Sequence, residues 1–249
     1  MIDLLGVGVP SDGDGWWLHR VCARIQRCAL TAVVSSQPGE RRALLDAVGG
    51  RFVPDEGRIW VHGVPVRRDF LSRIRARVRE VELTARLHER RSALGHTLIA
   101  ASARRASLLG LLPFPRATER QIAESVLAEV ELADRAHVPI VRLTPSERVR
   151  LAVARVLAQD PEVIFAHDAD LVTGADAGWL LRTLATVARA RGVTALVGLV
   201  GLEAARQYAD RVIVLTRGSL VFDGPPERLA GEQPWRFASL RAGGNDRPA

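Results

Sequence analysis

Residues 32–50, "AVVSSQPGERRALLDAVGG", decide the fold because they join three elements of different character. The apolar run Leu30–Val34 has the length and composition of a buried β-strand, and a short polar stretch follows it. Leu44, Leu45 and Val48 then recur at the spacing of one helix face. The stretch therefore predicts a strand, a loop and a helix in immediate succession.

The rest of the chain repeats this alternation of short apolar runs and helical patterns, which predicts an α/β fold. We expect strands over Ile2–Val9, Trp17–Ile25, Leu30–Ser35, Arg58–His62, Val78–Leu83, Val163–His167, Thr194–Leu199, Arg211–Leu215 and Ser219–Phe222. We expect helices over Glu40–Val48, Ser92–Ala103, Glu119–Val130, Ser146–Ala158, Ala177–Arg191 and Glu203–Tyr208. Residues 84–142 show no strand pattern, so they are expected to form an inserted helical subdomain.

The composition is that of a folded globular chain, with 47% apolar and 25% charged residues. Cys22 and Cys28 have no cluster of cysteine or histidine at metal-ligand spacing around them, so neither a disulfide framework nor a zinc site is indicated. The N-terminal sequence lacks the basic start and apolar stretch of a signal peptide, and the apolar runs fall short of the roughly 20 residues that span a bilayer. We therefore expect a reduced, cytoplasmic location.

The net charge of +7 is carried almost wholly by arginine. Such a charge suits nucleic acid, a membrane surface or an acidic partner, and it also arises in any arginine-rich proteome. The arginines are densest over residues 67–79 and 86–105 but form no single stripe, so a nucleic-acid partner is not favoured.

Several segments resemble, in one order, the nucleotide-binding subunit of ABC transporters, most closely the ATPase subunits of phosphonate-type importers. The segments are "GRIWVHGVPV" (57–66), "LHERRSALGHTLIA" (87–100), "RASLLGLLPFP" (105–115), "VRLAVARVLAQDPEVIFAHD" (149–168) and "YADRVIVLTRGSLVFDGPPERL" (208–229). The resemblance covers about residues 1–232. It implies a P-loop NTPase-like fold with an N-terminal antiparallel β-subdomain, a core of about 1–83 and 143–232, a helical subdomain of about 84–142, and a C-terminal tail over 233–249.

The resemblance also aligns the family's phosphate-binding loop with residues that differ from those that bind phosphate in the family. A P-loop needs glycines that turn backbone N–H groups toward the phosphates, a lysine, and a hydroxyl that binds Mg²⁺. Pro38 removes an N–H, Glu40 puts a negative charge at the β-phosphate position, and Arg41 replaces the lysine. We expect Arg41 to pair with Glu40. The altered loop comprises Ser35, Ser36, Gln37, Pro38, Gly39, Glu40, Arg41, Arg42 and Ala43.

The family's other catalytic positions are altered too. The glutamine that senses Mg²⁺ falls on Leu83, the switch histidine on Val200, and the D-loop on Leu171, Thr173 and Gly174. The Walker B aspartate falls on His167, the catalytic glutamate on Asp168, and the signature loop on Thr144, Pro145, Ser146 and Glu147. Phosphoryl transfer depends on positioning and charge stabilisation, so these replacements together predict a pseudo-ATPase without a confident catalytic residue. A metal site of His167, Asp168 and Asp170 is disfavoured, because neighbours on a strand point to opposite faces.

Three functions are compatible with this pattern. The first is a non-hydrolysing structural or regulatory subunit of a phosphonate-type transport system or an associated assembly. It would form a dimer or hetero-assembly and dock a membrane permease or a soluble phosphonate-processing partner through about residues 84–115, at the inner face of the cell membrane. The second is an ATP-binding subunit with residual binding, in which Arg41 or Arg42 contacts the phosphates and Asp168 the Mg²⁺. The third is a basic nucleic-acid-binding protein on the same scaffold. The alternative to all three is a decaying gene whose product has no selected function.

Overall fold

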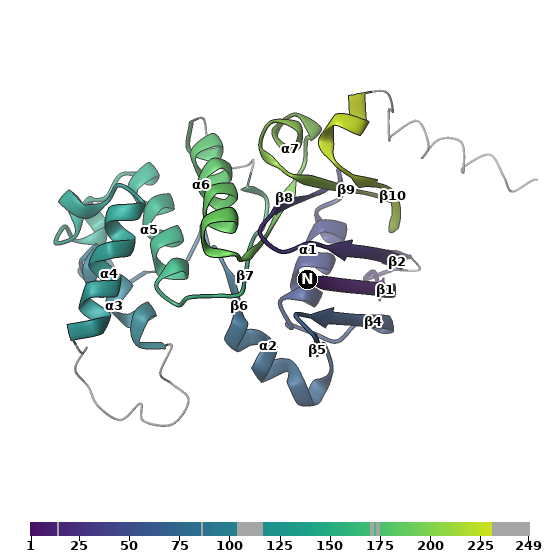
Figure 1. The fold of residues 1–249 in the computed structure, drawn as a ribbon, viewed down its shortest axis with the longest axis horizontal. Coiled ribbons are helices and arrows are strands. Elements are labelled where there is room, and N and C mark those ends of the chain that lie inside the picture. Colours follow the sequence, from purple (N-terminus) through teal and green to yellow (C-terminus); the bar gives the residue numbers. More distant parts are fainter. Residues whose placement is uncertain (14, 86, 104–116, 170–171, 173–174, 231–249) are drawn as a thin grey trace, which may run out of the picture. The chain divides into compact units, whose positions relative to one another are not determined.

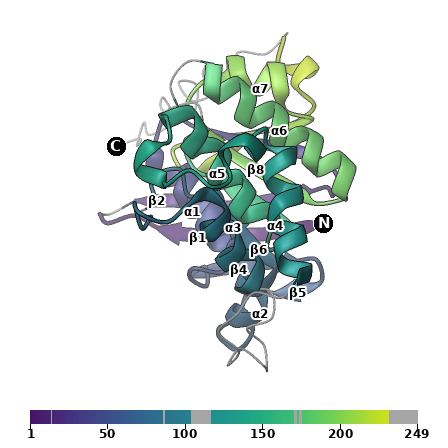
Figure 2. The same cartoon turned by 90° about the vertical axis from the view of Figure 1, so that its left-hand side faces the viewer.

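The computed structural model describes residues 1–13, 15–85, 87–103, 117–169, 172 and 175–230. The chain divides into two compact units, of which the first comprises Met1–Val78 and Glu162–Ala249 and the second comprises Arg79–Pro161 (Figures 1 and 2). Among the described helices, none is both long enough and apolar enough to cross a membrane.

The first unit begins with an antiparallel sheet in the strand order β2-β1-β4-β5. In the first half of β1, Ile2 and Leu4 are buried whereas Asp3 and Leu5 are not, as expected for a strand with one face on the core. The strands are β1 (Ile2–Pro10), β2 (Trp16–Ile25), β4 (Glu56–Val61) and β5 (Val64–Pro65).

The second sheet of this unit contains parallel strands in the order β9-β3-β8-β7, and β10 pairs antiparallel with β9. Every residue of its central strands is buried, as expected for parallel strands covered on both faces. The strands are β3 (Leu30–Val34), β7 (Val163–Ala166), β8 (Thr194–Leu199), β9 (Arg211–Thr216) and β10 (Ser219–Gly224). The α/β class is therefore confirmed.

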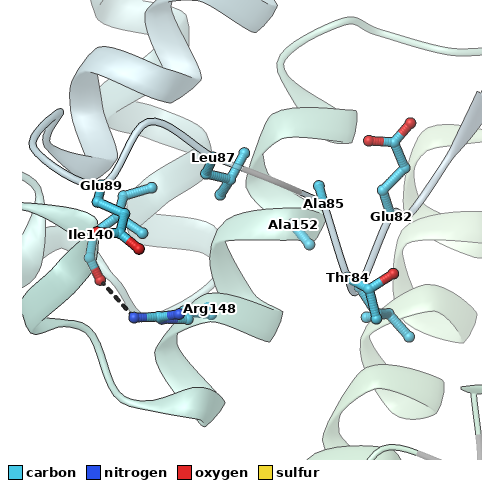
Figure 3. A pocket seen from close by; sticks show the side chains of 9 residues that line it. Glu82, Thr84, Ala85, Leu87, Glu89, Ile140, Arg148 and Ala152 are labelled. Atoms are coloured by element: carbon cyan, nitrogen blue, oxygen red, sulfur yellow. Dashed lines mark hydrogen bonds between the residues drawn. The ribbon is translucent and has the colours of Figure 1, made fainter.

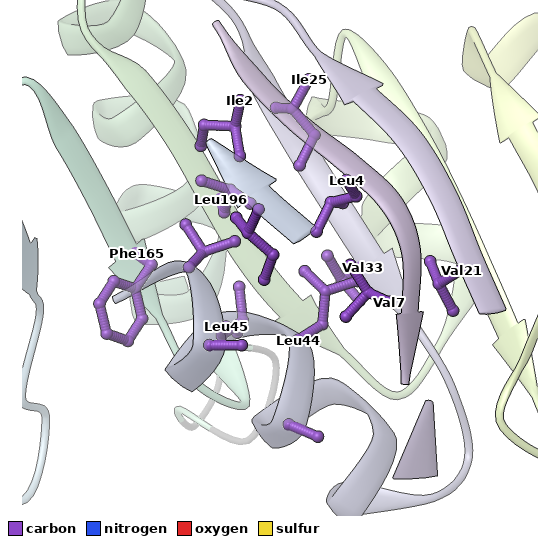
Figure 4. Close-up of a cluster of buried hydrophobic side chains, with 14 of the residues drawn as sticks. Ile2, Leu4, Val7, Val21, Ile25, Val33, Leu44, Leu45, Phe165 and Leu196 are labelled. Carbon is purple, nitrogen blue, oxygen red and sulfur yellow. The ribbon is translucent and has the colours of Figure 1, made fainter. Parts of the chain in front are cut away.

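Helix α1 (Pro38–Val48) lies between the two sheets and supplies the centre of the core. Figure 4 shows Leu44 and Leu45 of α1 among side chains of both sheets, including Leu4 and Leu196. The other helices of the unit are α2 (Leu71–Arg77), α6 (Ala175–Arg191) and α7 (Leu202–Tyr208), with 3-10 turns at Arg68–Phe70 and Pro226–Ala230.

The second unit is helical. Its helices α3 (Ala93–Ser102), α4 (Ala117–Glu129) and α5 (Pro145–Leu157) pack against one another, with 3-10 turns at Ala133–Arg135 and Ile140–Arg142. The unit spans Arg79–Pro161, whereas the sequence placed a helical block at about 84–142. The predicted tail over 233–249 lies outside the described residues.

Two elements differ from the sequence-based expectation. The strand expected over Val78–Leu83 is the short β6 (Val78–Glu80), and the sequence pattern does not predict α2. Helix α2 is only seven residues long, and Leu71 and Ile74 are its only bulky apolar residues, which are too few to form a helical pattern.

Candidate functional site

The loop after β3 enters α1 at the carboxyl end of the parallel sheet. The backbone N–H of Ser35 donates to the carbonyl of Leu199 at 3.2 Å, which attaches the start of the loop to β8. Pro38 occupies the first helical turn, where a missing N–H costs no intrahelical bond. Residues Ser36, Gln37 and Pro38 are exposed. The predicted strand–loop–helix unit is thus confirmed.

Glu40 turns into the protein from the first turn of α1, and only 2% of the residue is exposed. One carboxylate oxygen accepts a hydrogen bond from the Ser35 hydroxyl at 2.5 Å, and the other accepts from the backbone N–H of Gly218 at 2.7 Å. Gly218 lies in the turn between β9 and β10 and has a φ of +75°. The carboxylate therefore ties the loop to a distant hairpin, and its charge is favourable near a helix N-terminus.

Arg41 is also buried, with 1% of the residue exposed. Its Nε donates to Oδ1 of Asp168 at 3.0 Å, its Nη2 contacts the same oxygen at 2.5 Å, and its Nη1 donates to the carbonyl of Ser35. The expected ion pair between Arg41 and Glu40 is therefore wrong. Neighbouring residues on a helix point about 100° apart, so the two side chains diverge to different partners.

His167 and Asp168 follow β7 and likewise diverge. Nε2 of His167 lies 3.0 Å from Oδ1 of Asp46 on α1, and Nε of Arg51 lies 3.3 Å from the same oxygen. The described residues include no group of three histidine, cysteine, aspartate or glutamate side chains that would hold a metal ion. Asp170, the third member of the metal site considered above, lies outside the described residues.

Trp17 covers the loop at Gly39. A Cβ built on Gly39 would lie 2.3 Å from the Trp17 ring, so no other residue fits there without displacing the indole. Trp17 is half-buried and also packs against the apolar core. The Trp17 ring therefore packs against the loop at Gly39, next to the position where the Glu40 carboxylate holds it.

The second predicted element, Thr144–Glu147, lies in the helical unit and begins α5. The Thr144 hydroxyl accepts from the Glu147 N–H at 3.2 Å, and the Glu147 carboxylate accepts from the Thr144 N–H at 2.8 Å. Nε of Arg135 also donates to Glu147 at 2.7 Å. The pKa of Glu147 is lowered, first by the hydrogen bond from Arg135 and then by that from Thr144. These contacts form a complete capping box, which satisfies the backbone N–H groups of Thr144 and Glu147 within the chain.

A sequence model of the family described as "ABC transporter" matches residues 43–169, which is just over half of the chain. This chain belongs to the ABC transporter family. The match begins at Ala43, so the loop from Ser35 to Arg42 precedes the matched region.

Two relatives of this chain are named as import ATP-binding proteins. The "Phosphonates import ATP-binding protein PhnC" of Thiobacillus denitrificans is 30% identical over 219 residues, covering 86% of this chain and 83% of the relative. The "Phosphite import ATP-binding protein PxtA" of Stutzerimonas stutzeri is 38% identical over 159 residues, but these are only 63% of this chain and 57% of that relative.

Solved structures of the family share the fold. The cbiO1 protein of Clostridium perfringens, described as part of an ABC transporter complex, superposes with a TM-score of 0.79 at 18% identity and covers 96% of this chain and 94% of that protein. The ATP-binding cassette MJ0796, in a dimer bound to ADP and Pi, superposes with a TM-score of 0.73 at 21% identity, covering 91% of this chain and 99% of that one. The P-loop-like ABC fold is therefore confirmed.

Two helix N-termini of this ABC chain have the same local design. Pro38, Gly39 and Glu40 open α1, and Pro145, Ser146 and Glu147 open α5, so each helix has proline at its first position and glutamate at its third. A helix N-terminus attracts anions because its N–H groups lack intrahelical acceptors. In α5 the Glu147 carboxylate is bonded at that end, whereas in α1 the Glu40 carboxylate is bonded to the Ser35 hydroxyl and the Gly218 N–H.

The structure also describes four further positions that the sequence pointed to. Arg42 is exposed, Ala43 is buried, and Val200 is 43% exposed after β8. Leu83 lines a pocket within the helical unit. No sequence pattern indicates the role of Gly218. Asp46 is detectable as an acidic residue within the apolar helical run "LLDAV", where a charge needs a partner.

Proposed function

We propose that this ABC transporter chain is a non-hydrolysing subunit that acts as a structural or regulatory component rather than as an ATPase. The observation that supports this most strongly is the buried Glu40 carboxylate, which holds the loop at the position where the family's resemblance places the β-phosphate. A triphosphate entering this loop would meet a negative charge and two donors that are already bonded.

The energies support the same proposal. Binding that is no tighter than 100 μM supplies about 5.5 kcal/mol. An ion pair such as Arg41–Asp168 is worth up to about 4 kcal/mol at the effective dielectric of a protein, and less here because the Asp168 side chain is 26% exposed. Breaking the ion pair of Arg41 would thus offset a large share of the binding free energy of a weakly bound nucleotide. Repulsion between Glu40 and the phosphates would reduce the affinity further.

The biological setting follows from the relatives. Because PhnC and PxtA are named as phosphonate and phosphite import proteins, we propose that this chain works in a phosphonate-type import system or an assembly associated with one. It would then lie in the cytoplasm, peripheral to the membrane, as one subunit of a dimer or hetero-assembly. Neither ATP nor Mg²⁺ would be a cofactor of this subunit.

The helical unit offers a surface for the partner of such an assembly. A pocket of about 530 Å³ is lined by residues that include Glu82, Leu87 and Glu89 (Figure 3). Figure 3 shows the two glutamates at opposite ends of the pocket, with apolar side chains between them. Arg148, whose guanidinium donates to the carbonyl of Ile140, also lines the pocket, so the arrangement suits a partner segment that carries an apolar side chain between polar groups. Part of the docking region proposed from the sequence, residues 104–115, lies outside the described residues.

Isothermal titration with Mg-ATP tests the proposal. We expect no saturable heat from the wild-type chain, with PhnC of Thiobacillus denitrificans as the positive control. The alternative function is residual ATP binding through Arg41 or Arg42 with Asp168 at the Mg²⁺. Saturable binding tighter than about 100 μM that disappears in Arg41→Ala would establish it and overturn the proposal.

Affinity capture from native cells tests the assembly. A co-purifying permease would place the chain in a transporter, and a co-purifying soluble enzyme would place it in a processing assembly. We expect Leu87→Asp, inside the pocket, to abolish capture, while Ile99→Asp, at a residue that is 50% exposed outside the pocket, leaves it intact. Equal capture by both variants would contradict docking at the pocket.

A further inference from the structure

The segment Arg67–Arg77, "RRDFLSRIRAR", concentrates positive charge in the first unit. It contains five arginines and one acidic residue, Asp69. The 3-10 turn Arg68–Phe70 leads into α2, which lies beyond the β5 edge of the antiparallel sheet in both views (Figures 1 and 2). We call these eleven residues the α2 basic segment.

Apolar side chains fix the α2 basic segment to the unit, and its arginines face solvent. Ile74 is fully buried, and Phe70 and Leu71 are half-buried. The residues that are exposed and positively charged are Arg67, Arg68, Arg73 and Arg75. The segment is therefore held in place by its apolar face and presents guanidinium groups outward.

These charges are poorly neutralised by the protein itself. Arg77 lies 3.4 Å from a carboxylate oxygen of Glu162, and Arg75 donates to the carbonyl of Gly50 at 2.8 Å. Arg67, Arg68 and Arg73 form no ion pair with any residue in the described part of the chain. Since exposed arginines without carboxylate partners raise the local potential, this surface attracts an anionic partner.

We propose that the α2 basic segment binds the surface of an anionic phospholipid bilayer. Arginine beside partly exposed apolar side chains is the pattern of segments that lie at the lipid headgroups, and here Phe70 and Leu71 accompany the guanidinium groups. Nucleic acid is less suited, because the guanidinium of Arg73 lies over the Phe70 ring, 5.7 Å from its centre, and would compete with a base for that ring. This binding requires neither nucleotide nor permease and goes beyond the function proposed above.

The strength of binding follows from the number of arginines. A basic residue close to an anionic leaflet contributes a factor of about five to the partition coefficient. Replacing three arginines should therefore weaken binding on the order of 100-fold. Added salt should weaken it as well, because surface charges are screened.

Vesicle flotation of the full chain tests the proposal. The vesicles are made of phosphatidylcholine alone or of phosphatidylcholine mixed with phosphatidylglycerol. The test variant is Arg67→Gln/Arg68→Gln/Arg73→Gln. The control variant, Arg20→Gln/Arg58→Gln/Arg90→Gln, removes the same charge from exposed arginines outside the α2 basic segment. Circular dichroism establishes that both variants are folded.

We expect the wild type and the control to float with the mixed vesicles and not with phosphatidylcholine, while the test variant loses binding by about 100-fold. Absence of wild-type binding to the mixed vesicles would overturn the proposal. So would an equal loss in both variants, because net charge alone would then explain the binding. Tighter binding of an oligonucleotide duplex at the same salt, lost only in the test variant, would assign the segment to nucleic acid instead.

Discussion

Replacing Glu40 by alanine removes the carboxylate that holds the loop together. The two lost hydrogen bonds involve a charged acceptor, and such bonds contribute about 1.5–3 kcal/mol each. The buried N–H of Gly218 would be left without its acceptor, whereas the desolvation cost of the carboxylate would be regained. We therefore expect the free energy of unfolding to fall by about 3 kcal/mol, which lowers Tm by roughly 6–12 °C for a domain of this size.

Thermal and urea unfolding followed by circular dichroism measure this effect. Glu40→Gln keeps the shape and one acceptor oxygen, so its stability should lie between those of the wild type and Glu40→Ala. Glu203→Ala, at an exposed residue of α7, is the control and should change stability by no more than about 0.5 kcal/mol. A Glu40→Ala protein as stable as the wild type would refute the reasoning, since the carboxylate would then contribute nothing to the loop.

Three further perturbations test neighbouring contacts. Gly39→Ala should lower the free energy of unfolding by about 1–3 kcal/mol, because the added methyl group clashes with the Trp17 ring. In a Trp17→Ala background the same substitution should cost much less, and equal costs in the two backgrounds of this double-mutant cycle would contradict the contact. The hydrogen bond from Arg135 lowers the folded-state pKa of Glu147, so the ionised carboxylate stabilises the fold above the ordinary pKa of 4.5 and this stabilisation is lost as the pH falls below that value. The difference in the free energy of unfolding between the wild type and Glu147→Gln should therefore shrink between pH 6 and pH 3 in urea titrations. Burial lowers the pKa of His62 below 6.5, so the unfolded chain binds more protons there and stability should fall as pH drops below 6.5; an unchanged pH dependence in His62→Gln would oppose this.

The elements of the fold were largely predictable because they depend on local patterns. The continuous apolar runs of β3 and β8 and the amphipathic α5 contain enough periodicity to identify each element. Helix α2 has only one buried turn, which gives too few apolar positions for a pattern to emerge.

The site was predictable in its composition but not in its contacts. The resemblance identified Glu40 and Arg41 as replacements of phosphate-binding residues. Their partners depend on tertiary structure, because Gly218 is 178 positions from Glu40 and Asp168 is 127 positions from Arg41. The wrong pairing of Arg41 with Glu40 arose from sequence proximity, which does not bring adjacent helical side chains together.

A crystal soaked with Mg²⁺ and a non-hydrolysable ATP analogue tests the central claim most directly. We predict that Glu40 stays bonded to Ser35 and Gly218, that Arg41 stays paired with Asp168, and that no triphosphate is ordered in the loop. Ordered phosphoryl groups with Mg²⁺ against Pro38–Ala43, with Arg41 released from Asp168, would contradict the claim that this loop does not bind a nucleotide.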